Sequence, residues 1–507
     1  MKKKAAVGLL LAALVATAHA AESPVSGGTL NVALGSDTPI IDPSITGYSV
    51  TALITRNVVD SLVGQAEDNR FTPWLALRWE INDNHTQYTF HLRKDVTFSD
   101  KTRLDAQAVK YNLDRILDPK TTSSYAKSLL GPIDSITTPD DFTVVIHYKT
   151  PFAPLLQGLS LPYLGIQSPA YLKNTPNTSN TVVGSGPFIL KSFVKGNGSQ
   201  LTRRDDYQWG PGYAHHQGPA WLSAINFKYL PESSVRLGAL TSGQVQAIDA
   251  VPPANVRALQ HNPHVSILTK ENPGIARVLY LNTSKGPFSD VNVRQAFLHA
   301  VDPASAVKVA FFGTLKPADS VLGPQTLYYD ANARVSAAQP AKQLSPGQPL
   351  TVHFLYDPTS TESADVTLFQ AIQFQVKKAG FNLQFDPVDS GIFSARTASN
   401  DYDIVSNFYV RAEPDILRTV FHSAYIPPKG ANYSHVHSLD DKLTLAIGAP
   451  DAQRKQIYSD IQRQVIEQAY VVPLYIPAYQ LGISKKVQGI SWATNAKPNF
   501  YDAWLSN

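Results

Sequence analysis

Two short stretches place a lysine three residues after a serine, the spacing that some serine acyl-transfer enzymes use for a nucleophile and its basic partner. They are Ser124-Tyr125-Ala126-Lys127 and Ser192-Phe193-Val194-Lys195. Neither has a nearby S-D-N motif, and the sequence contains no K-T-G motif. A pattern this short arises by chance in a chain of 507 residues. A secreted hydrolase therefore stands only as an alternative from a different functional class.

Histidines occur close together at two places, His215-His216 and His435-Val436-His437. A zinc or nickel site needs three or four ligands that converge in space, and spacing alone does not show such convergence. Exposed loop histidines explain both pairs equally well. The sequence also lacks a G-x-S-x-G elbow, a P-loop and an H-E-x-x-H helix. These observations favour a binding protein over an enzyme.

Composition narrows the function classes further. Hydrophobic residues make up 43% of the chain and charged residues 17%, so the chain can bury large cores and extended disorder is excluded. Without Lys2, Lys3 and Lys4 the chain carries 41 basic and 40 acidic residues, a balance that does not favour nucleic-acid binding. The absence of cysteine excludes disulfides, thiolate metal sites and a cysteine-linked lipid anchor.

The first twenty residues have the three parts of a secretory signal peptide. Lys2 to Lys4 form the positive region, Ala5 to Thr17 the apolar region, and Ala18-His19-Ala20 the cleavage site. An apolar run of about 13 residues is short for a membrane span, which needs about 20. No later run reaches that length. We therefore expect a soluble periplasmic protein without a lipid anchor.

Helix and strand patterns alternate along the remaining chain. Period-two alternation predicts strands, and apolar residues at helical spacing predict helices. Asp105 and Asp290 are the expected N-caps of two helices, and Gly380 the expected stop of a third. The predicted strands are 29–34, 88–92, 142–148, 381–385 and 470–476, and the predicted helices are 105–117, 290–301, 362–379 and one around 457–465. This alternation indicates an α/β fold.

Several segments, taken in chain order, resemble the peptide/nickel/opine family of periplasmic solute-binding proteins, which serve ABC importers. One departure is Lys101, which stands where the family usually has glycine. The segments are Tyr88–Asp100 ("YTFxLRxxVxFxDG"), Leu104–Val109 ("FxAxDV"), Val183–Phe188 ("VGTGPY"), Leu237–Val245 ("xxALxSGEVD"), Leu281-Asn282 with Pro287–Asp290 and Val293–Phe297 ("LNxxxxPFxDxRVRQA"), and Val301-Asp302. The matches run from about Leu30 to about Ile476.

The resemblance implies a two-lobed, type II periplasmic binding protein with a ligand cleft between the lobes. The first lobe is expected to hold residues 24–272 and 475–507, with a subdomain inserted at about 60–181. The second lobe is expected to hold 273–474. The expected function is to capture a small ligand by lobe closure and deliver it to the inner-membrane permease. Neither a cofactor nor catalysis is implied, and a monomer is expected.

The identity of the ligand depends on a segment that departs from the family pattern. Peptide-binding members carry "GWxxDxxDPD", whose first aspartate neutralises the peptide ammonium. Aligning Glu413-Pro414-Asp415 with "DPD" puts Val410 at that aspartate, with Arg411 beside it. An ammonium buried there lacks its partner, so ordinary peptides are disfavoured. Arg411 suits a carboxylate, which favours a peptide-like or opine-like anionic conjugate; pairing with Glu413 or Asp415 is the alternative.

The remaining site residues are carried over from the family by position. Gly184, Ser185 and Gly186 leave room for backbone amides to approach a ligand, or else only permit a tight turn. Binding of a nickel or metallophore complex is the second alternative, with His435 as its metal contact. The other candidate ligand contacts are Tyr48, Tyr125, Phe408, Tyr409 and Asn432.

Overall fold

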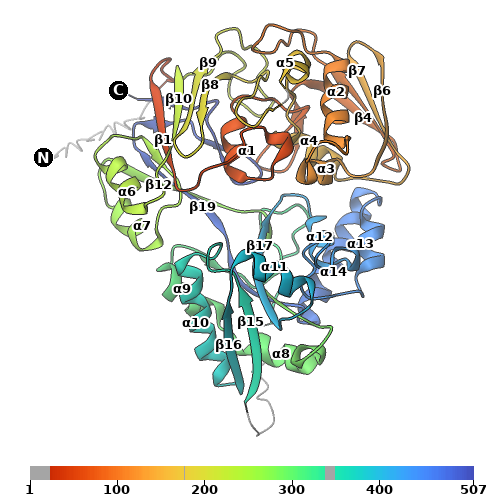
Figure 1. The fold of residues 1–507 in the computed structure, drawn as a ribbon, viewed down its shortest axis with the longest axis vertical. Helices are drawn as coiled ribbons and strands as arrows, with labels where there is room; N and C mark the ends of the chain where they lie inside the picture. Colours follow the sequence, from red (N-terminus) through yellow and green to blue (C-terminus); the bar gives the residue numbers. More distant parts are fainter. Residues whose placement is uncertain (1–22, 176, 337–348, 507) are drawn as a thin grey trace, which may run out of the picture.

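The computed structural model describes residues 23–175, 177–336 and 349–506. Within them the chain forms two lobes, one above the other in Figure 1, each built around its own mixed β-sheet. The signal peptide predicted at residues 1–20 lies outside the described residues.

The first lobe is built on a seven-stranded sheet in which distant parts of the chain lie side by side. Strand β1 lies near the middle and pairs in parallel with β10 and β11, while β19 returns from the end of the chain to pair with β11 and β12. In sheet order the strands are β12 (Val265–Glu271), β19 (Ala478–Ser484), β11 (Ala247–Ile248), β1 (Thr29–Leu34), β10 (Ala224–Tyr229), β9 (Gly198–Arg203) and β8 (Phe188–Val194).

Short helices and strands complete this lobe. Helices α6 and α7 lie together beside β12 (Figure 1). The helices are α1 (Ser49–Thr55), α4 (Leu155–Ser160), α5 (Pro169–Asn174), α6 (Ser233–Thr241) and α7 (Pro253–Gln260), with the short helical turns η1 (Pro43–Ile45) and η2 (Pro162–Leu164). The short strands are β2 (Val63–Gln65), β3 (Phe71–Pro73), β20 (Val487–Gln488), β21 (Ser491–Trp492), β22 (Pro498–Asn499) and β23 (Trp504–Leu505).

An antiparallel four-stranded sheet forms a subdomain on one side of the first lobe. Helix α2 packs on this sheet, and α3 packs against α4 (Figure 1). Its buried residues belong to the same core cluster as those of the larger sheet, so the subdomain is fused to the lobe. Its elements are β4 (Ala76–Ile81), β5 (Gln87–Leu92), β7 (Thr143–Tyr148), β6 (Ile133–Asp140), α2 (Ala106–Leu117) and α3 (Ser124–Leu130).

The second lobe is a six-stranded sheet covered on both faces by helices. Residues of α8, α9 and α10 form the core on one face, and residues of α12, α13 and α14 form the core on the other. The strands, in sheet order, are β14 (Lys316–Pro317), β18 (Val471–Ile476), β13 (Gly274–Leu281), β17 (Ile404–Val410), β15 (Leu350–Tyr356) and β16 (Phe381–Pro387). The helices are α8 (Val291–Ala300), α9 (Pro303–Phe311), α10 (Ser363–Lys377), α11 (Ser390–Ala398), α12 (Ile416–Phe421), α13 (Asp440–Ala446) and α14 (Asp451–Glu467), with turns η3 (Pro287–Ser289) and η4 (Ser423–Tyr425).

The chain passes between the two large sheets twice, and the two passages are hydrogen-bonded to each other. The first joins β12 to β13, and the second joins β18 to β19. The amide of Asn272 donates to the carbonyl of Pro477 at 2.8 Å. Tyr475 and Ile476 still pair within the second sheet, so the second passage falls at Pro477, two residues after the predicted start of the tail.

The predicted helices and strands correspond to observed elements because local signals determine them. Asp105 accepts a hydrogen bond from the amide of Ala108, and Asp290 accepts one from Asn292, as N-caps do. Gly380 follows α10 with a φ of +93°, a conformation that favours glycine. Lys101, where the family usually has glycine, adopts a φ of +71°. The fold therefore imposes the turn conformation even where the usual residue is absent.

Candidate functional site

The candidate ligand site lies where the carboxyl end of β17 meets the first lobe. Strands β15, β16 and β17 run in parallel, and in such sheets ligands bind beyond the carboxyl ends of the strands. Arg411 follows directly after β17, and its amide donates to the carbonyl of Pro273 in the first passage between the lobes. Its guanidinium Nε approaches Oε1 of Gln157 on α4 at 3.4 Å. Arg411 therefore stands at the boundary between the lobes.

Arg411 has no carboxylate partner within ion-pair distance among the described residues. Glu413 pairs with Arg454 and Asp415 pairs with Arg418, both at distances of 2.5–2.6 Å. Each of these two buried carboxylates thus already has an arginine partner. The alternative in which one of them pairs with Arg411 is not found in this structure. A half-buried guanidinium without a counter-charge is suited to bind an anion from outside the chain.

Val410 is the last residue of β17 and pairs with Gly274 across the sheet. Its side chain is half-buried and carries no charge. At the position where the family resemblance calls for an acid, this chain therefore offers no counter-charge for a free ammonium group.

Two of the predicted aromatic residues come together on the first-lobe side of the site. The ring of Tyr125, on α3, packs edge-on against Tyr163 of η2 with 4.8 Å between ring centres. The Tyr163 hydroxyl donates to the carbonyls of Gly47 and Tyr48, at 3.3 and 3.4 Å. The side chain of Tyr48 is 54% exposed. Burial raises the pKa of Tyr125, and the nearby charge of Arg411 opposes that shift, so this tyrosine lies close to the unpaired cation.

Phe408 and Tyr409 point to opposite faces of the second sheet, as neighbouring residues of a strand do. The ring of Phe408 lies 5.6 Å from the guanidinium carbon of Arg277, which pairs with Asp365 at 3.1 Å. Tyr409 packs on the core formed with α12, α13 and α14, and its hydroxyl accepts from the amide of Asn407 at 3.1 Å. The structure thus directs Tyr409 into the second-lobe core.

The glycine segment does not present its amides to a ligand. Gly186 donates its amide to the carbonyl of Val58 at 2.9 Å, and Ser185 donates its hydroxyl to Asp60 at 2.9 Å. A Cβ on Gly184 would lie 2.1 Å from the carbonyl oxygen of Val58. These residues are buried, and they allow the segment to pack against residues 57–59. This packing agrees with the tight-turn alternative, and the ligand contact of these residues stays a prediction.

Two further candidates lie away from the site. Asn432 is fully buried, and its side chain bonds to Phe421 at the end of α12 and to Val436. His435 contacts the Tyr402 hydroxyl at 3.1 Å near the opposite end of the second sheet from Arg411, on an open groove of about 490 Å³. No cluster of three metal-ligating side chains occurs in the described ranges. Neither residue lies beside Arg411 in this structure, and the ligand contacts predicted for them stay predictions.

Sequence reasoning missed the residues that surround Arg411 from the other lobe. Gln157 and Tyr163 belong to α4 and η2, and Gln157 is 254 residues from Arg411 along the chain. No local signal marks Gln157. Tyr163 is likewise not marked by any local signal in the sequence.

The serine–lysine pairs do not form a catalytic centre. Ser124 and Lys127 are both exposed on α3. Ser192 is half-buried on β8 and its hydroxyl contacts Gln200 at 3.4 Å, while Lys195 is exposed. In neither pair is there a hydrogen bond between the serine and the lysine among the interactions of the described residues, so the geometry of an activated nucleophile is not formed.

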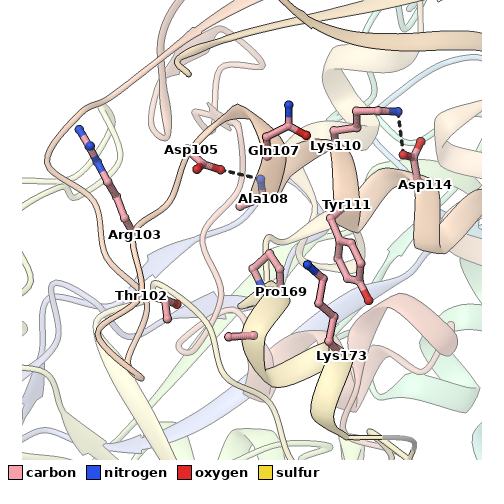
Figure 2. Close-up of a pocket in the computed structure, with 11 residues that line it drawn as sticks. Thr102, Arg103, Asp105, Gln107, Ala108, Lys110, Tyr111, Asp114, Pro169 and Lys173 are labelled. Atoms are coloured by element: carbon pink, nitrogen blue, oxygen red, sulfur yellow. Dashed lines mark hydrogen bonds and ion pairs between the residues drawn. The ribbon is translucent and has the colours of Figure 1, made fainter. Parts of the chain in front are cut away.

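The outer face of the subdomain carries a separate groove of about 370 Å³ between α2 and α5 (Figure 2). Its charged groups have local partners. Asp105 caps α2, Lys110 pairs with Asp114 at 2.7 Å, and the Lys173 ammonium lies 5.1 Å from the ring centre of Tyr111. We therefore do not assign the ligand to this groove.

The fold and the inter-lobe position of the unpaired Arg411 define a two-lobed solute-binding protein. The profile of bacterial extracellular solute-binding proteins, family 5, matches residues 70–417. The chain belongs to this family, as the sequence segments predicted. No helix in the described part of the chain combines the length and the hydrophobicity of a membrane span.

Curated relatives and solved structures agree with this assignment over nearly the whole chain. The chain is 26% identical to the probable D,D-dipeptide-binding periplasmic protein DdpA of Escherichia coli K12, over 95% of this chain and 94% of that protein. It is 26% identical to the glutathione-binding protein GsiB of the same strain, over 98% of each. The structure of NikA from Brucella suis in complex with Fe(III)-EDTA superposes with a TM-score of 0.82 at 25% identity, covering 94% of this chain and all of that one.

The predicted α/β architecture with two lobes is confirmed by these structures and by the two sheets of this chain. The chain is thus the substrate-binding component of an ABC transporter. Proteins of this kind are transport-associated binding proteins, and neither the hydrolase nor the nickel-complex alternative is favoured.

Proposed function

We propose that this protein binds a small peptide-like or opine-like anionic conjugate between its lobes and delivers it to an inner-membrane permease. The observation that supports the proposal is that no carboxylate of the described residues lies within ion-pair distance of Arg411, whose two neighbouring acids are bound by other arginines. Tyr48, Tyr125 and Phe408 would contact the uncharged part of the ligand.

We also propose where the protein acts and how its chain is divided between the lobes. The protein acts in the periplasm without a lipid anchor, as a monomer, and does not transform its ligand. The lobes are residues 24–272 with a tail that starts at Pro477 rather than at 475, and residues 273–476, and the subdomain is inserted at about 60–181. The hydrogen bond between Asn272 and Pro477 supports a hinge at this boundary, because it ties the two passages together.

The ligand class is tested by thermal unfolding of the mature protein with three kinds of compound. These are peptides with a free amine, N-acylated acidic dipeptides, and nickel with and without histidine. At about one hundred times its dissociation constant, a ligand adds roughly 2.7 kcal/mol to the free energy of unfolding. For a chain of this size the midpoint then rises by a few degrees. We expect the N-acylated acidic dipeptides to produce the rise.

Arg411→Gln should abolish that rise, because it removes the only charge assigned to the ligand. Arg463→Gln is the matched control, since Arg463 lies on α14 of the same lobe and pairs with Asp460 at 2.6 Å. A rise produced by free peptides and retained in Arg411→Gln would contradict the assignment of an anion to this residue. A rise produced only by nickel with histidine would support the metal-complex alternative instead.

A further inference from the structure

The subdomain and the second lobe meet at a second contact, away from the two passages of the chain, and His85 lies in it. This histidine occupies the turn between β4 and β5, with a φ of +54°. Its carbonyl accepts from the amide of Phe152 at 3.0 Å. The next residue, Ala153, donates its amide to the carbonyl of Ile447 in the second lobe at 2.8 Å. The backbone of His85 is therefore bonded to the segment that touches the other lobe.

The imidazole of His85 is half-buried and faces groups of the second lobe. The groups that act on its charge are the backbone of Gly448 and the side chains of Asp451 and Arg454, in the first turn of α14 and just before it. The Nδ1 atom of the ring is buried and has no hydrogen-bond partner among the described residues. Nε2 is therefore the ring nitrogen that faces the backbone of Gly448. The second contact thus consists of His85 and residues 151–153 of the subdomain, and residues 447–454 of the second lobe.

This environment suits a neutral imidazole better than a charged one. A neutral ring carries its proton on one nitrogen only, and a proton on Nε2 leaves the buried Nδ1 unprotonated. Protonation of the ring adds an N–H at Nδ1, where no acceptor lies, and an unpaired buried donor is costly. Burial lowers the pKa of His85 from its ordinary value of 6.5, and the charge of Arg454 lowers it further, against Asp451 and the backbone of Gly448. Since these groups belong to the other lobe, they act on His85 while the lobes touch.

The other titratable and charged groups around the second contact already have partners. Among the described residues, none of the acids forms an ion pair with His85, so a proton on this ring is not neutralised by a neighbouring carboxylate. The groups are Glu413, which binds Arg454 at 2.5 Å; Asp451, which accepts from the Tyr328 hydroxyl at 3.1 Å; Tyr88, which donates to the carbonyl of Phe152 at 2.8 Å; and Lys149, which pairs with Asp134 at 3.2 Å.

We propose that protonation of His85 weakens the second contact and allows the lobes to separate, so that acidic pH favours release of the ligand. The inference concerns the regulation of the proposed ligand site and rests on the proposed function, because Arg411 and Gln157 approach each other across the same boundary. Well above pH 6.5 His85 is neutral whether or not the lobes touch, and the contact is intact. The contact weakens as the pH falls through 6.5, because the separated state takes up the proton first.

Spin labels on Ser135→Cys of β6 and Leu445→Cys of α13, two exposed and uncharged positions in the two lobes, report the separation by pulsed electron resonance. We expect a shift to longer distances between pH 7.5 and pH 5.5. His85→Gln, which is neutral at both pH values, should remove this shift. His147→Gln is the matched control, because His147 lies on β7 of the same sheet and is also half-buried, and it should keep the shift. Distances that do not depend on pH, or a shift of equal size in His85→Gln, would overturn the proposal.

The titration of the ring itself gives a second readout, which a merely structural histidine would not change. In protein that carries isotope-labelled histidine, the nuclear magnetic resonance signal of His85 is the one that His85→Gln lacks. We expect its pKa to lie below 6.5 in the wild type and to return toward 6.5 in Gly448→Ala. A Cβ on Gly448 would lie 2.3 Å from the Cβ of Pro151, so this substitution disturbs the contact and leaves His85 in place. Equal pKa values in the two proteins would show that the second lobe does not act on His85.

The distance and titration measurements use no ligand, so their failure is distinguishable from failure of the proposed ligand class. For an N-acylated acidic dipeptide that stabilises the protein, the dissociation constant should rise between pH 7.5 and pH 5.5, by up to about tenfold for each pH unit between the pKa values of His85 in the two states. The rise should be smaller in His85→Gln. Failure of every dipeptide, together with a His85-dependent change in distance, would reject the ligand class and keep the pH-sensitive contact. A dissociation constant that does not depend on pH, despite such a change in distance, would overturn release of the ligand by acid.

Discussion

The choice of ion-pair partners around Arg411 shows that closeness in sequence does not decide which charges meet. Glu413 and Asp415 are two and four residues from Arg411, yet they bind Arg454 and Arg418. Both carboxylates are at least 95% buried, and a buried carboxylate needs a well-placed guanidinium. Arg411 thereby has neither of these two acids as an ion-pair partner, which supports the proposed anion site. Asp60 shows a related pattern, because three uncharged donors rather than an arginine bind its carboxylate.

Asp60 should make stability depend on pH in a defined direction. Burial raises its pKa from 3.8 to about 6, against the hydrogen bonds from Ser185 and Trp209. The folded protein therefore binds this proton more tightly than the unfolded chain. The stabilisation is fully present below about pH 4 and is lost as the pH rises through 6, a change of about 3 kcal/mol.

Denaturant unfolding of the wild type and of Asp60→Asn at pH values from 4 to 7.5 measures this effect. The free energy of unfolding of Asp60→Asn, minus that of the wild type, should rise by about 3 kcal/mol from the lowest to the highest pH. Asp205→Asn, at a side chain 80% exposed, controls for the loss of a charge. A difference that stays constant with pH would show that Asp60 titrates alike in both states.

At the scale of elements, the glycine segment before β8 is a packing contact. The carbonyl of Val58 lies where a side chain on Gly184 would be. Gly184→Ala should therefore lower the free energy of unfolding by about 1–3 kcal/mol, because an added methyl forces the backbones apart. Denaturant unfolding measures the loss. Gly218→Ala is the control, since the nearest atom to its Cβ would be 3.9 Å away, and equal effects of the two substitutions would contradict the packing role.

The elements themselves were predictable and the site was not, for physical reasons that particular residues illustrate. Asp105 and Asp290 indicate where their helices begin, because an N-cap side chain bonds to an amide two or three residues further along the chain. Gln157 carries no such signal, because its contact with Arg411 forms only when the end of α4 is placed against the second lobe. The glycine segment was recognisable as a motif, but whether its amides faced a ligand or Val58 depended on the packing of α1 and the residues after it.

For the whole molecule, two of the contacts between the lobes involve hydrogen bonds between backbone groups. One is the pair of passages at Asn272 and Pro477. The other joins the subdomain to the end of α13, where the amide of Ala153 donates to the carbonyl of Ile447 at 2.8 Å and Pro151 packs on Gly448. Arg411 and Gln157 meet across the same boundary. The second contact thus holds the subdomain against the second lobe, in addition to the passages.

Gly448 makes this second contact possible, and its substitution should favour separation of the lobes. A Cβ at this position would lie 2.3 Å from the Cβ of Pro151 in the other lobe. In Gly448→Ala the clash exists only while the lobes touch, so the closed state alone is destabilised. Overpacking typically costs 1–3 kcal/mol, and a cost of about 1.4 kcal/mol weakens ligand binding roughly tenfold. Gly238→Ala is the control, because no atom lies within 4 Å of its Cβ.

The distance between the lobes can be measured directly because the chain contains no cysteine. Spin labels on Lys149→Cys and Leu445→Cys, whose side chains are exposed in the two lobes near this contact, report the distance by pulsed electron resonance. Gly448→Ala should shift the distribution to longer distances, and the stabilising compound of the panel should reverse the shift only partly. A ligand shifts the equilibrium between open and closed lobes by no more than the difference between its binding free energies to the two states. If Gly448→Ala destabilises the closed state, weaker ligand binding and longer distances must therefore appear together. Longer distances with unchanged affinity would show that the site is complete without the second contact.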